Sequence, residues 1–250
     1  MGPIIEIDNL IHRFADGTVG LDGITLAIEA GAFVVVAGAN GSGKTTLLYH
    51  LNGLLLPTSG RVRVAGSSVR EDPLQARLQV GMVFQDADSQ IVGETVRDDV
   101  AFGPENLGLE RAEIDRRVQE ALAATGLTHL ADKRPHLLSG GEKRRLAVAG
   151  VLAMRPRVIA CDEPFSNLDY PGVRQVLDQI LRLHRAGCTI VVTTHDLEKV
   201  LAHADRLVFM RAGRIEADGP PPALIARAER YGVRSPRAAH LGMEALSWLN

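Results

Sequence analysis

The chain has 250 residues, of which 46% are hydrophobic, and its 28 lysines and arginines nearly balance its 30 aspartates and glutamates. A chain of this length buries roughly 70–75% of the surface that its unfolded form exposes, so it needs neither a metal nor a disulfide to fold. The near-neutral charge argues against a basic nucleic-acid coat and against an acidic disordered tail as the main function. Any binding to polyanions must therefore be local.

Cysteine usage and the first residues indicate a protein of the reducing cytoplasm. Cys161 and Cys188 lie in apolar stretches and form no C-x-x-C pair, which predicts two reduced thiols. No basic region followed by an apolar stretch opens the sequence, so we expect no secretory signal. The longest apolar runs reach about half of the roughly 18 residues that span a bilayer. If a membrane is involved, we expect another subunit to span it.

The N-terminal part predicts an antiparallel β layer, followed by a parallel sheet. Asp16-Gly17 and Asp22-Gly23 tolerate positive φ and favour hairpin turns. Buried strands of a parallel sheet are predicted from short apolar runs rich in β-branched residues, namely 32–37, 80–84, 158–161 and 189–193. A helical pattern over 173–184 separates the last two runs. Strands that alternate with helices predict an α/β sheet with right-handed crossovers.

Helical periodicity without buried strands dominates the middle of the chain. It is clearest over residues 110–125 and 142–154, so we expect a helical subdomain over about residues 88–156, inserted in the α/β core. The three prolines at 220–222 are expected to stop regular structure. The predicted organisation is an ATPase domain over 1–219 and a C-terminal tail over 220–250, which could serve dimer contacts.

A phosphate-binding loop follows the first buried strand. Residues 38–45 read GANGSGKT, fit G-x-x-x-x-G-K-[ST], and precede a helical run. Backbone N–H groups of such a loop cradle phosphates, Lys44 reaches the β- and γ-phosphates, and the Thr45 hydroxyl ligates Mg²⁺. A glycine-rich turn that binds nothing is the alternative, but the pattern arises by chance in only roughly one chain per hundred. The motif predicts binding of ATP and Mg²⁺.

Two adjacent acids end the strand over 158–161. Because side-chain direction alternates along a strand, Asp162 can face the Mg²⁺ beside Thr45, while Glu163 can polarise the water that attacks the γ-phosphate. An isolated Asp-Glu pair is more often a solvated turn. The phosphate loop upstream reverses that preference.

The sequence LSGGE at 138–142 distinguishes among P-loop proteins. Ser139 is a good helix N-cap, and the two glycines permit close backbone approach to a second phosphate. Ser139 and Glu142 alone would be read as an ordinary capping box. Placed shortly before the Asp-Glu strand, the segment resembles the signature of the ATP-binding-cassette (ABC) ATPases, and the chain is similar to that family up to about residue 219.

The ABC resemblance assigns the remaining motifs by position. Phe14 stands where the family places an aromatic ring on adenine, Gln85 matches the Q-loop glutamine that reaches metal and water, and His195 matches the switch histidine. Residues 166–169 match the D-loop. The fold implied is a P-loop NTPase with a RecA-like parallel sheet. The catalytic residues expected are Glu163, His195 and Gln85, and the metal ligands are Thr45, Gln85 and Asp162. The nucleotide-binding residues expected are Phe14, Asn40, Gly41, Ser42, Gly43, Lys44, Thr45, Thr46, Ser139, Gly140, Gly141, Glu142 and Asp169.

A finer resemblance covers the segments 85–91, 99–108, 52–54 and 149–153, which are similar to the ATPase subunits of energy-coupling factor importers of cobalt, nickel, biotin and other vitamins. Cys161, where an aliphatic residue is usual, and Phe165, where threonine is frequent, depart from the pattern without removing a catalytic group. The resemblance implies a second ATPase subunit, identical or a close paralogue, a transmembrane coupling subunit and a substrate-binding membrane subunit. It implies no nucleic acid, and a peripheral location on the cytoplasmic face of the membrane.

The sequence also predicts two surface features. Residues 143–145 form a basic triplet, which we interpret as a solvated helix face rather than a nucleic-acid patch. Apolar residues after Gln85 are expected to leave part of their surface exposed as a groove for a helix of the membrane subunit. These apolar residues are Ile91, Val92, Val96, Val100 and Phe102.

Two other functions are compatible with part of the sequence. A soluble ABC ATPase of Fe–S cluster assembly fits the length, and co-purification with a multi-span membrane protein would distinguish it from a transporter subunit. A nucleotide kinase would leave the signature segment and His195 without a task. The sequence names neither the cargo nor the composition of the ATPase pair.

Overall fold

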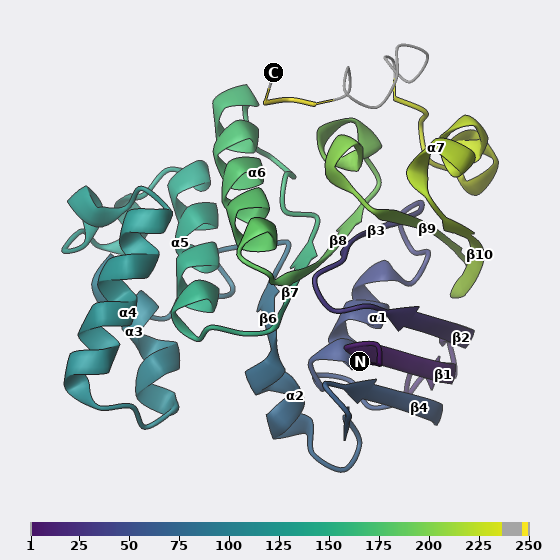
Figure 1. The fold of residues 1–250 in the computed structure, drawn as a ribbon, viewed down its shortest axis with the longest axis horizontal. Coiled ribbons are helices and arrows are strands. Elements are labelled where there is room, and N and C mark those ends of the chain that lie inside the picture. The colour runs from purple at the N-terminus through teal and green to yellow at the C-terminus, as the bar shows by residue number, and fades with distance from the viewer. Residues whose placement is uncertain (1, 237–246, 250) are drawn as a thin grey trace.

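The computed structural model describes residues 2–236 and 247–249, and it contains two sheets and a group of helices (Figure 1). The larger sheet has the strand order β10-β9-β3-β8-β7-β6, and the smaller has the order β2-β1-β4-β5. The strands are β1 (Ile5–Arg13), β2 (Val19–Ile28), β3 (Phe33–Ala37), β4 (Ser59–Val64), β5 (Ser67–Ser68), β6 (Val80–Val83), β7 (Val158–Asp162), β8 (Thr189–Thr194), β9 (Arg206–Arg211) and β10 (Arg214–Gly219).

Seven α-helices and several 3₁₀ segments complete the described part of the chain. The α-helices are α1 (Lys44–Leu51), α2 (Pro73–Gln79), α3 (Val96–Asn106), α4 (Arg111–Ala124), α5 (Gly140–Ala153), α6 (Tyr170–Arg185) and α7 (Pro221–Leu224). The 3₁₀ segments are Thr128–Leu130, Pro135–Leu137, Leu197–Lys199, Leu201–His203 and Ile225–Tyr231.

The central strands β3, β8, β7 and β6 are parallel to one another and buried on both faces. That is why they read as continuous apolar runs rather than alternating ones. One face packs against α6 through residues such as Leu177 and Ile180. The other face packs against α1 through Leu47 and Leu51 and against the smaller sheet. The predicted parallel core is therefore confirmed, with the four strands close to the expected ranges.

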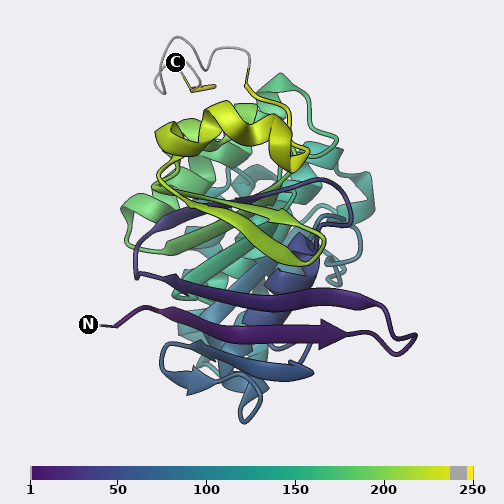
Figure 2. The ribbon, with the colours of Figure 1, turned by 90° about the vertical axis from the view of Figure 1, so that its right-hand side faces the viewer.

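The smaller sheet is the predicted antiparallel layer, and its long strands are seen across the molecule in Figure 2. Asp16-Gly17 forms the expected turn between β1 and β2. The turn predicted at Asp22-Gly23 is wrong, because both residues lie inside β2. There the pairing passes from Leu10 opposite Ile24 to His12 opposite Leu21, which leaves one extra residue on β2. Gly23, with φ of +72°, supplies the positive φ of this bulge instead of a turn.

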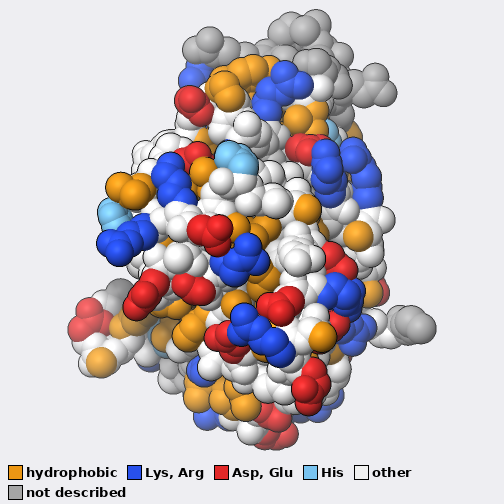
Figure 3. All heavy atoms as spheres, turned by 90° about the vertical axis from the view of Figure 1, so that its left-hand side faces the viewer, with side chains coloured by type: hydrophobic (Ala, Val, Ile, Leu, Met, Phe, Trp, Pro, Cys, Tyr) orange, Lys and Arg blue, Asp and Glu red, His pale blue; other side chains and the backbone are white. Residues whose placement is uncertain are grey.

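Helices α3, α4 and α5 form a separate layer with its own core, on the left of Figure 1. This arrangement is the inserted helical subdomain of the predicted fold class. Its outer surface shows acidic and basic side chains next to one another (Figure 3). On α4, Arg116 bridges Glu113 and Glu120, with 2.7 Å between the paired atoms. Such exposed pairs contribute little to stability, because water screens the charges.

Regular structure continues past the three prolines, contrary to the expectation from the sequence. Pro221 is the first residue of α7, where a missing N–H costs nothing and the fixed φ suits a helix start. The helix and the 3₁₀ segment after it pack against β9 and β10. The assignment of 220–250 to a tail with dimer contacts stays a prediction, and residues 237–246 and 250 lie outside the described part.

No helix in the described ranges is both long enough and apolar enough to cross a bilayer.

Candidate functional site

The phosphate loop connects β3 to α1 in the local geometry that its sequence predicts. Gly43, with φ of +101°, takes up the N-cap position of α1, and no side chain caps that end. The N–H groups of the first helical turn are therefore free to bind an anion. A Cβ at Gly38 would lie 2.3 Å from the Met210 carbonyl oxygen, so only glycine fits where the loop leaves the sheet.

Lys44 is buried at the base of this loop. Its Nζ donates hydrogen bonds to the carbonyl oxygens of Gly38 at 2.8 Å and Ala39 at 3.1 Å, and lies 4.0 Å from Glu163 Oε1. Burial lowers the pKa of Lys44, while the carboxylates of Glu163 and Asp162 oppose that shift. A buried ammonium held by two carbonyls is preorganised to meet further negative charge.

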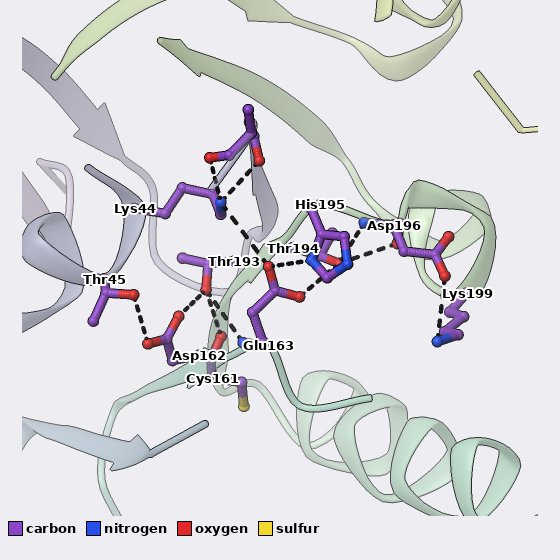
Figure 4. Close-up of polar contacts among 12 residues, drawn as sticks. Lys44, Thr45, Cys161, Asp162, Glu163, Thr193, Thr194, His195, Asp196 and Lys199 are labelled. Atoms are coloured by element: carbon purple, nitrogen blue, oxygen red, sulfur yellow. Dashed lines mark hydrogen bonds and ion pairs between the residues drawn. The ribbon is translucent and has the colours of Figure 1, made fainter. Parts of the chain in front are cut away.

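The Asp162 carboxylate lies between two threonine hydroxyls (Figure 4). Thr45 Oγ1 donates to Asp162 Oδ2 at 2.8 Å, and Thr193 Oγ1 donates to Asp162 Oδ1 at 2.5 Å. Thr193 is opposite Asp162 because β8 and β7 pair in parallel with these two residues in register. The result is a cluster of hard oxygen donors beside the phosphate loop, which is the ligand chemistry that Mg²⁺ prefers.

The next carboxylate, Glu163, points to a different set of partners. Its Oε1 lies 2.8 Å from His195 Nδ1, and Thr194 Oγ1 donates to Oε2 at 3.3 Å (Figure 4). Glu163 has φ of +45°, an uncommon value for a non-glycine residue. Its backbone N–H donates to the Thr193 carbonyl oxygen at 3.1 Å, which helps to hold the conformation. The two adjacent acids thus face separate partners, because β7 ends at Asp162 and the positive φ of Glu163 turns the chain out of the strand.

Lys44, Thr45 and Glu163 line one open cavity of about 460 Å³. The aromatic ring of Phe14, 40% exposed, is at its wall, and the exposed Gln85 also lines it. Asp162 and His195 do not line the cavity but contact residues that do. Asp162 accepts a hydrogen bond from Thr45, and His195 is hydrogen-bonded to Glu163. The predicted residues that line the cavity are Phe14, Asn40, Gly41, Ser42, Gly43, Lys44, Thr45, Thr46, Gln85 and Glu163.

Comparison with known proteins decides the family. Residues 21–166 match the ABC transporter family. The chain belongs to this family. The cobalt import ATP-binding protein CbiO of Rhodobacter capsulatus is 45% identical over 97% of this chain and 89% of its own length. The energy-coupling factor transporter ATP-binding protein EcfA of Methanocaldococcus jannaschii is 43% identical over 95% of this chain and 88% of its own.

The structural comparison agrees. CbiO1 from Clostridium perfringens, described as part of the ABC transporter complex CbiONQ, superposes with a TM-score of 0.83 at 37% identity, over 96% of this chain and 99% of that one. The resemblance read from the motifs is therefore confirmed, and so are the fold class and the ATPase assignment. This ABC ATPase is an ATP-binding subunit of the energy-coupling factor type.

The signature segment of the ABC ATPase lies outside the cavity of its own chain. Ser139 and Glu142 form a reciprocal capping box at the start of α5, with Ser139 N–H donating to Glu142 Oε2 at 2.6 Å. A Cβ would meet nothing within 4 Å at Gly140 or Gly141, so this end of the helix is open to an approaching group. Asp169 also lies outside, as the N-cap of α6 whose Oδ1 accepts from Gly172 N–H at 2.9 Å. Their nucleotide contacts stay predictions.

Sequence reasoning missed Thr193 and Thr194, and it misread Arg144. The two threonines end an apolar strand and carry no motif, and only the register between β7 and β8 makes them partners of the acids. The basic triplet is not a uniformly solvated face, because Arg144 is only 5% exposed. Its guanidinium is directed into the protein, where the backbone carbonyls of Phe84 and Ser166 accept its hydrogen bonds.

Two histidines are buried behind Phe14. The His12 ring contacts the Phe14 ring edge-on, and it also contacts His50, with 4.7 Å between the centroids in each pair. His50 Nδ1 lies 2.7 Å from the Thr46 carbonyl oxygen, so Nδ1 must carry the proton, and among the described residues the buried Nε2 forms no hydrogen bond of normal geometry. Burial lowers the pKa of His50, the bond to Thr46 opposes this, and His12 adds to it.

This lowered pKa predicts acid destabilisation. Below its ordinary pKa of about 6.5, His50 binds a proton in the unfolded chain but not in the folded one, so the free energy of unfolding should fall as pH drops from about 7 to 5. One such group contributes a slope of at most about 1.4 kcal/mol per pH unit. Urea unfolding of His50→Leu at several pH values should show a smaller slope than the wild type. The exposed His129→Leu serves as control, and equal slopes for His50→Leu and the wild type would contradict the prediction.

Proposed function

We propose that this chain binds and hydrolyses MgATP to energise an importer of a transition-metal ion such as cobalt or nickel, or of a vitamin such as biotin. The observation that carries the proposal is the convergence of Lys44, Thr45, Asp162 and Glu163 beside one cavity. The cargo class is supported by two relatives, one named as a cobalt import protein and one as an energy-coupling factor protein. A membrane subunit would bind the cargo.

The predicted site residues in and beside the cavity each have a task in this proposal. Phe14 stacks on adenine, and the loop over 40–46 and the start of α1 bind the phosphates. Lys44 contacts the β- and γ-phosphates. Thr45, Asp162 and Gln85 would hold Mg²⁺, which when bound neutralises charge developing on those phosphates. Asp162 is preorganised for this because Thr193 holds its second oxygen.

Glu163 acts as the general base toward the attacking water. His195 and Thr194 orient its carboxylate, with His195 Nδ1 at 2.8 Å and Thr194 Oγ1 at 3.3 Å. His195 is half exposed, so its ring can also contact the γ-phosphate. A carboxylate fixed in this way takes the water's proton without first losing conformational freedom.

The position of the signature segment supports a dimeric site. Ser139 and Gly141 lie at the open end of α5 and do not line the cavity of their own chain. In our proposal they contact the γ-phosphate bound by a second ATPase subunit, identical or a close paralogue. Nucleotide then lies between two chains, and hydrolysis removes the contacts that close the pair. Gly140, Glu142 and Asp169 belong to the same interface.

A second surface suits the membrane partner, and it corresponds to the groove expected after Gln85. Val96 and Val100 belong to the core of the helical subdomain, whereas Val92 is 61% and Phe102 is 52% exposed. Both exposed residues line an apolar groove of about 400 Å³ between α3, α5 and β6. The buried Asp99 shapes one wall, because its Oδ1 accepts from Val92 N–H at 2.7 Å and Gly93 N–H at 3.0 Å. We assign this groove to a cytoplasmic helix of the membrane-spanning subunit.

Replacing Val92 with aspartate tests the transporter assignment. A charge in the groove should weaken assembly with the membrane subunits and abolish coupled uptake, because the carboxylate would be desolvated by the docked helix. ATP hydrolysis by the isolated subunit should stay within about threefold, since Val92 does not line the nucleotide cavity. The measurements are co-purification of the complex, uptake of labelled cobalt or biotin, and phosphate release.

Val92→Ile is the matched control, because it keeps the groove apolar. Normal assembly and uptake by Val92→Asp would place the partner elsewhere. An active ATPase that binds no multi-span membrane protein would favour a soluble ABC ATPase of Fe–S cluster assembly instead.

A further inference from the structure

Arg144 connects α5, the helix that begins in the signature segment, to the segments that contain Gln85 and the D-loop. It lies five residues after Ser139 on α5, and its side chain is directed into the protein. Nη1 donates to the carbonyl oxygen of Phe84 at 2.7 Å, and Nη2 donates to that of Ser166 at 3.4 Å. One guanidinium on α5 therefore contacts the backbone of two other parts of the chain.

Both carbonyls belong to segments that carry a residue of the proposed reaction. Phe84 directly precedes Gln85. Ser166 begins the D-loop, and its N–H donates to the Glu163 carbonyl oxygen at 3.1 Å. A displacement of α5 along its axis would thus be transmitted through the hydrogen-bonded guanidinium to the backbone that holds Gln85 and to the turn that holds Glu163.

The surroundings do not suggest a purely stabilising role. Arg144 Nε is buried without a hydrogen-bond partner, and no carboxylate forms a salt bridge with this guanidinium within the described residues. Burying a charged group that has only two backbone carbonyls as hydrogen-bond partners costs free energy. A protein with an apolar side chain of similar volume in such a place is often at least as stable. A cavity of about 300 Å³ adjoins Arg144 and is bounded by all three segments, which leaves them room to shift.

We propose that Arg144 is a positioning residue that couples the placement of the signature helix to Gln85 and Glu163, and so sets the rate of ATP hydrolysis. The inference rests on the proposed function, since it requires Gln85 and Glu163 to act on ATP. A planar guanidinium can donate in two divergent directions at once, whereas a lysine ammonium on a flexible stem cannot hold both carbonyls in one geometry.

The first test separates turnover from binding. Arg144→Lys should lower kcat about tenfold or more, while the Kd for MgATP stays within about threefold, because the phosphate loop is untouched. Arg144→Gln, which keeps donors without the charge, provides a second variant if the lysine variant folds poorly. The control is Arg182→Lys on α6, an exposed arginine paired with Asp178, which should hydrolyse ATP at the wild-type rate.

A double-mutant cycle with Gln85→Ala then distinguishes positioning from general structural damage. If Arg144 acts through Gln85, the double variant should have a kcat within about twofold of the more impaired single variant. Losses that multiply, or wild-type kcat in both Arg144 variants, would overturn the inference. Wild-type activity of Gln85→Ala would instead overturn the proposed role of Gln85, and this inference with it, so the two failures are separable.

Discussion

Glu163→Gln should lower the rate of ATP hydrolysis at least about 100-fold while nucleotide binding is retained. The amide has the shape of the carboxylate and can still accept a hydrogen bond through its oxygen, but it cannot take a proton from water. Because ATP is then bound and not consumed, the ATP-closed dimer should accumulate. Phosphate release gives the rate, and size-exclusion chromatography with MgATP gives the dimer.

The matched control is Glu6→Gln, an exposed glutamate on β1 that does not line the cavity. It should hydrolyse ATP like the wild type and form no persistent dimer. Hydrolysis by Glu163→Gln at near the wild-type rate would show that another group is the base.

Mixing two inactive variants should restore hydrolysis. Lys44→Ala removes the ammonium that meets the phosphates, and Ser139→Arg blocks the signature end of α5. A mixed dimer joins the intact phosphate loop of the Ser139→Arg chain to the intact signature of the Lys44→Ala chain, so one of its two sites is complete. A dimer of either variant alone has no complete site. We therefore expect the rate of ATP hydrolysis to rise at least about tenfold on mixing, which is in the range of the losses caused by removing a catalytic group.

The control for this experiment pairs Lys44→Ala with the double variant Lys44→Ala/Ser139→Arg, because no combination of these chains contains a complete site. Folding of each protein is checked by circular dichroism, and the mixed dimer is detected by pull-down of differently tagged chains. A mixed dimer that forms and stays inactive would argue against sites shared between chains.

The features that the sequence determined by itself are those that depend on residues adjacent in the chain. The run over 33–37 is apolar at every position, so it had to be a strand covered on both faces, and the glycines at 38, 41 and 43 had to form a loop before a helix. The two acids at the end of a buried strand likewise marked Asp162 and Glu163 as candidate site residues, whereas the positive φ that turns Glu163 away from Asp162 is seen only in the structure. Local composition and periodicity carry such information directly.

Only the tertiary structure decided features that depend on pairing between distant segments. Thr193 became a partner of Asp162 through the register of two strands 31 residues apart, and Arg144 became buried because carbonyls from two other segments lie beside α5. In the same way, packing against α4 and α5 buried Val96 and Val100 and left Val92 exposed in the groove. Neither hydrophobicity nor charge at a single position specifies its neighbours in space, because these are set by how the sheets and helices pack together.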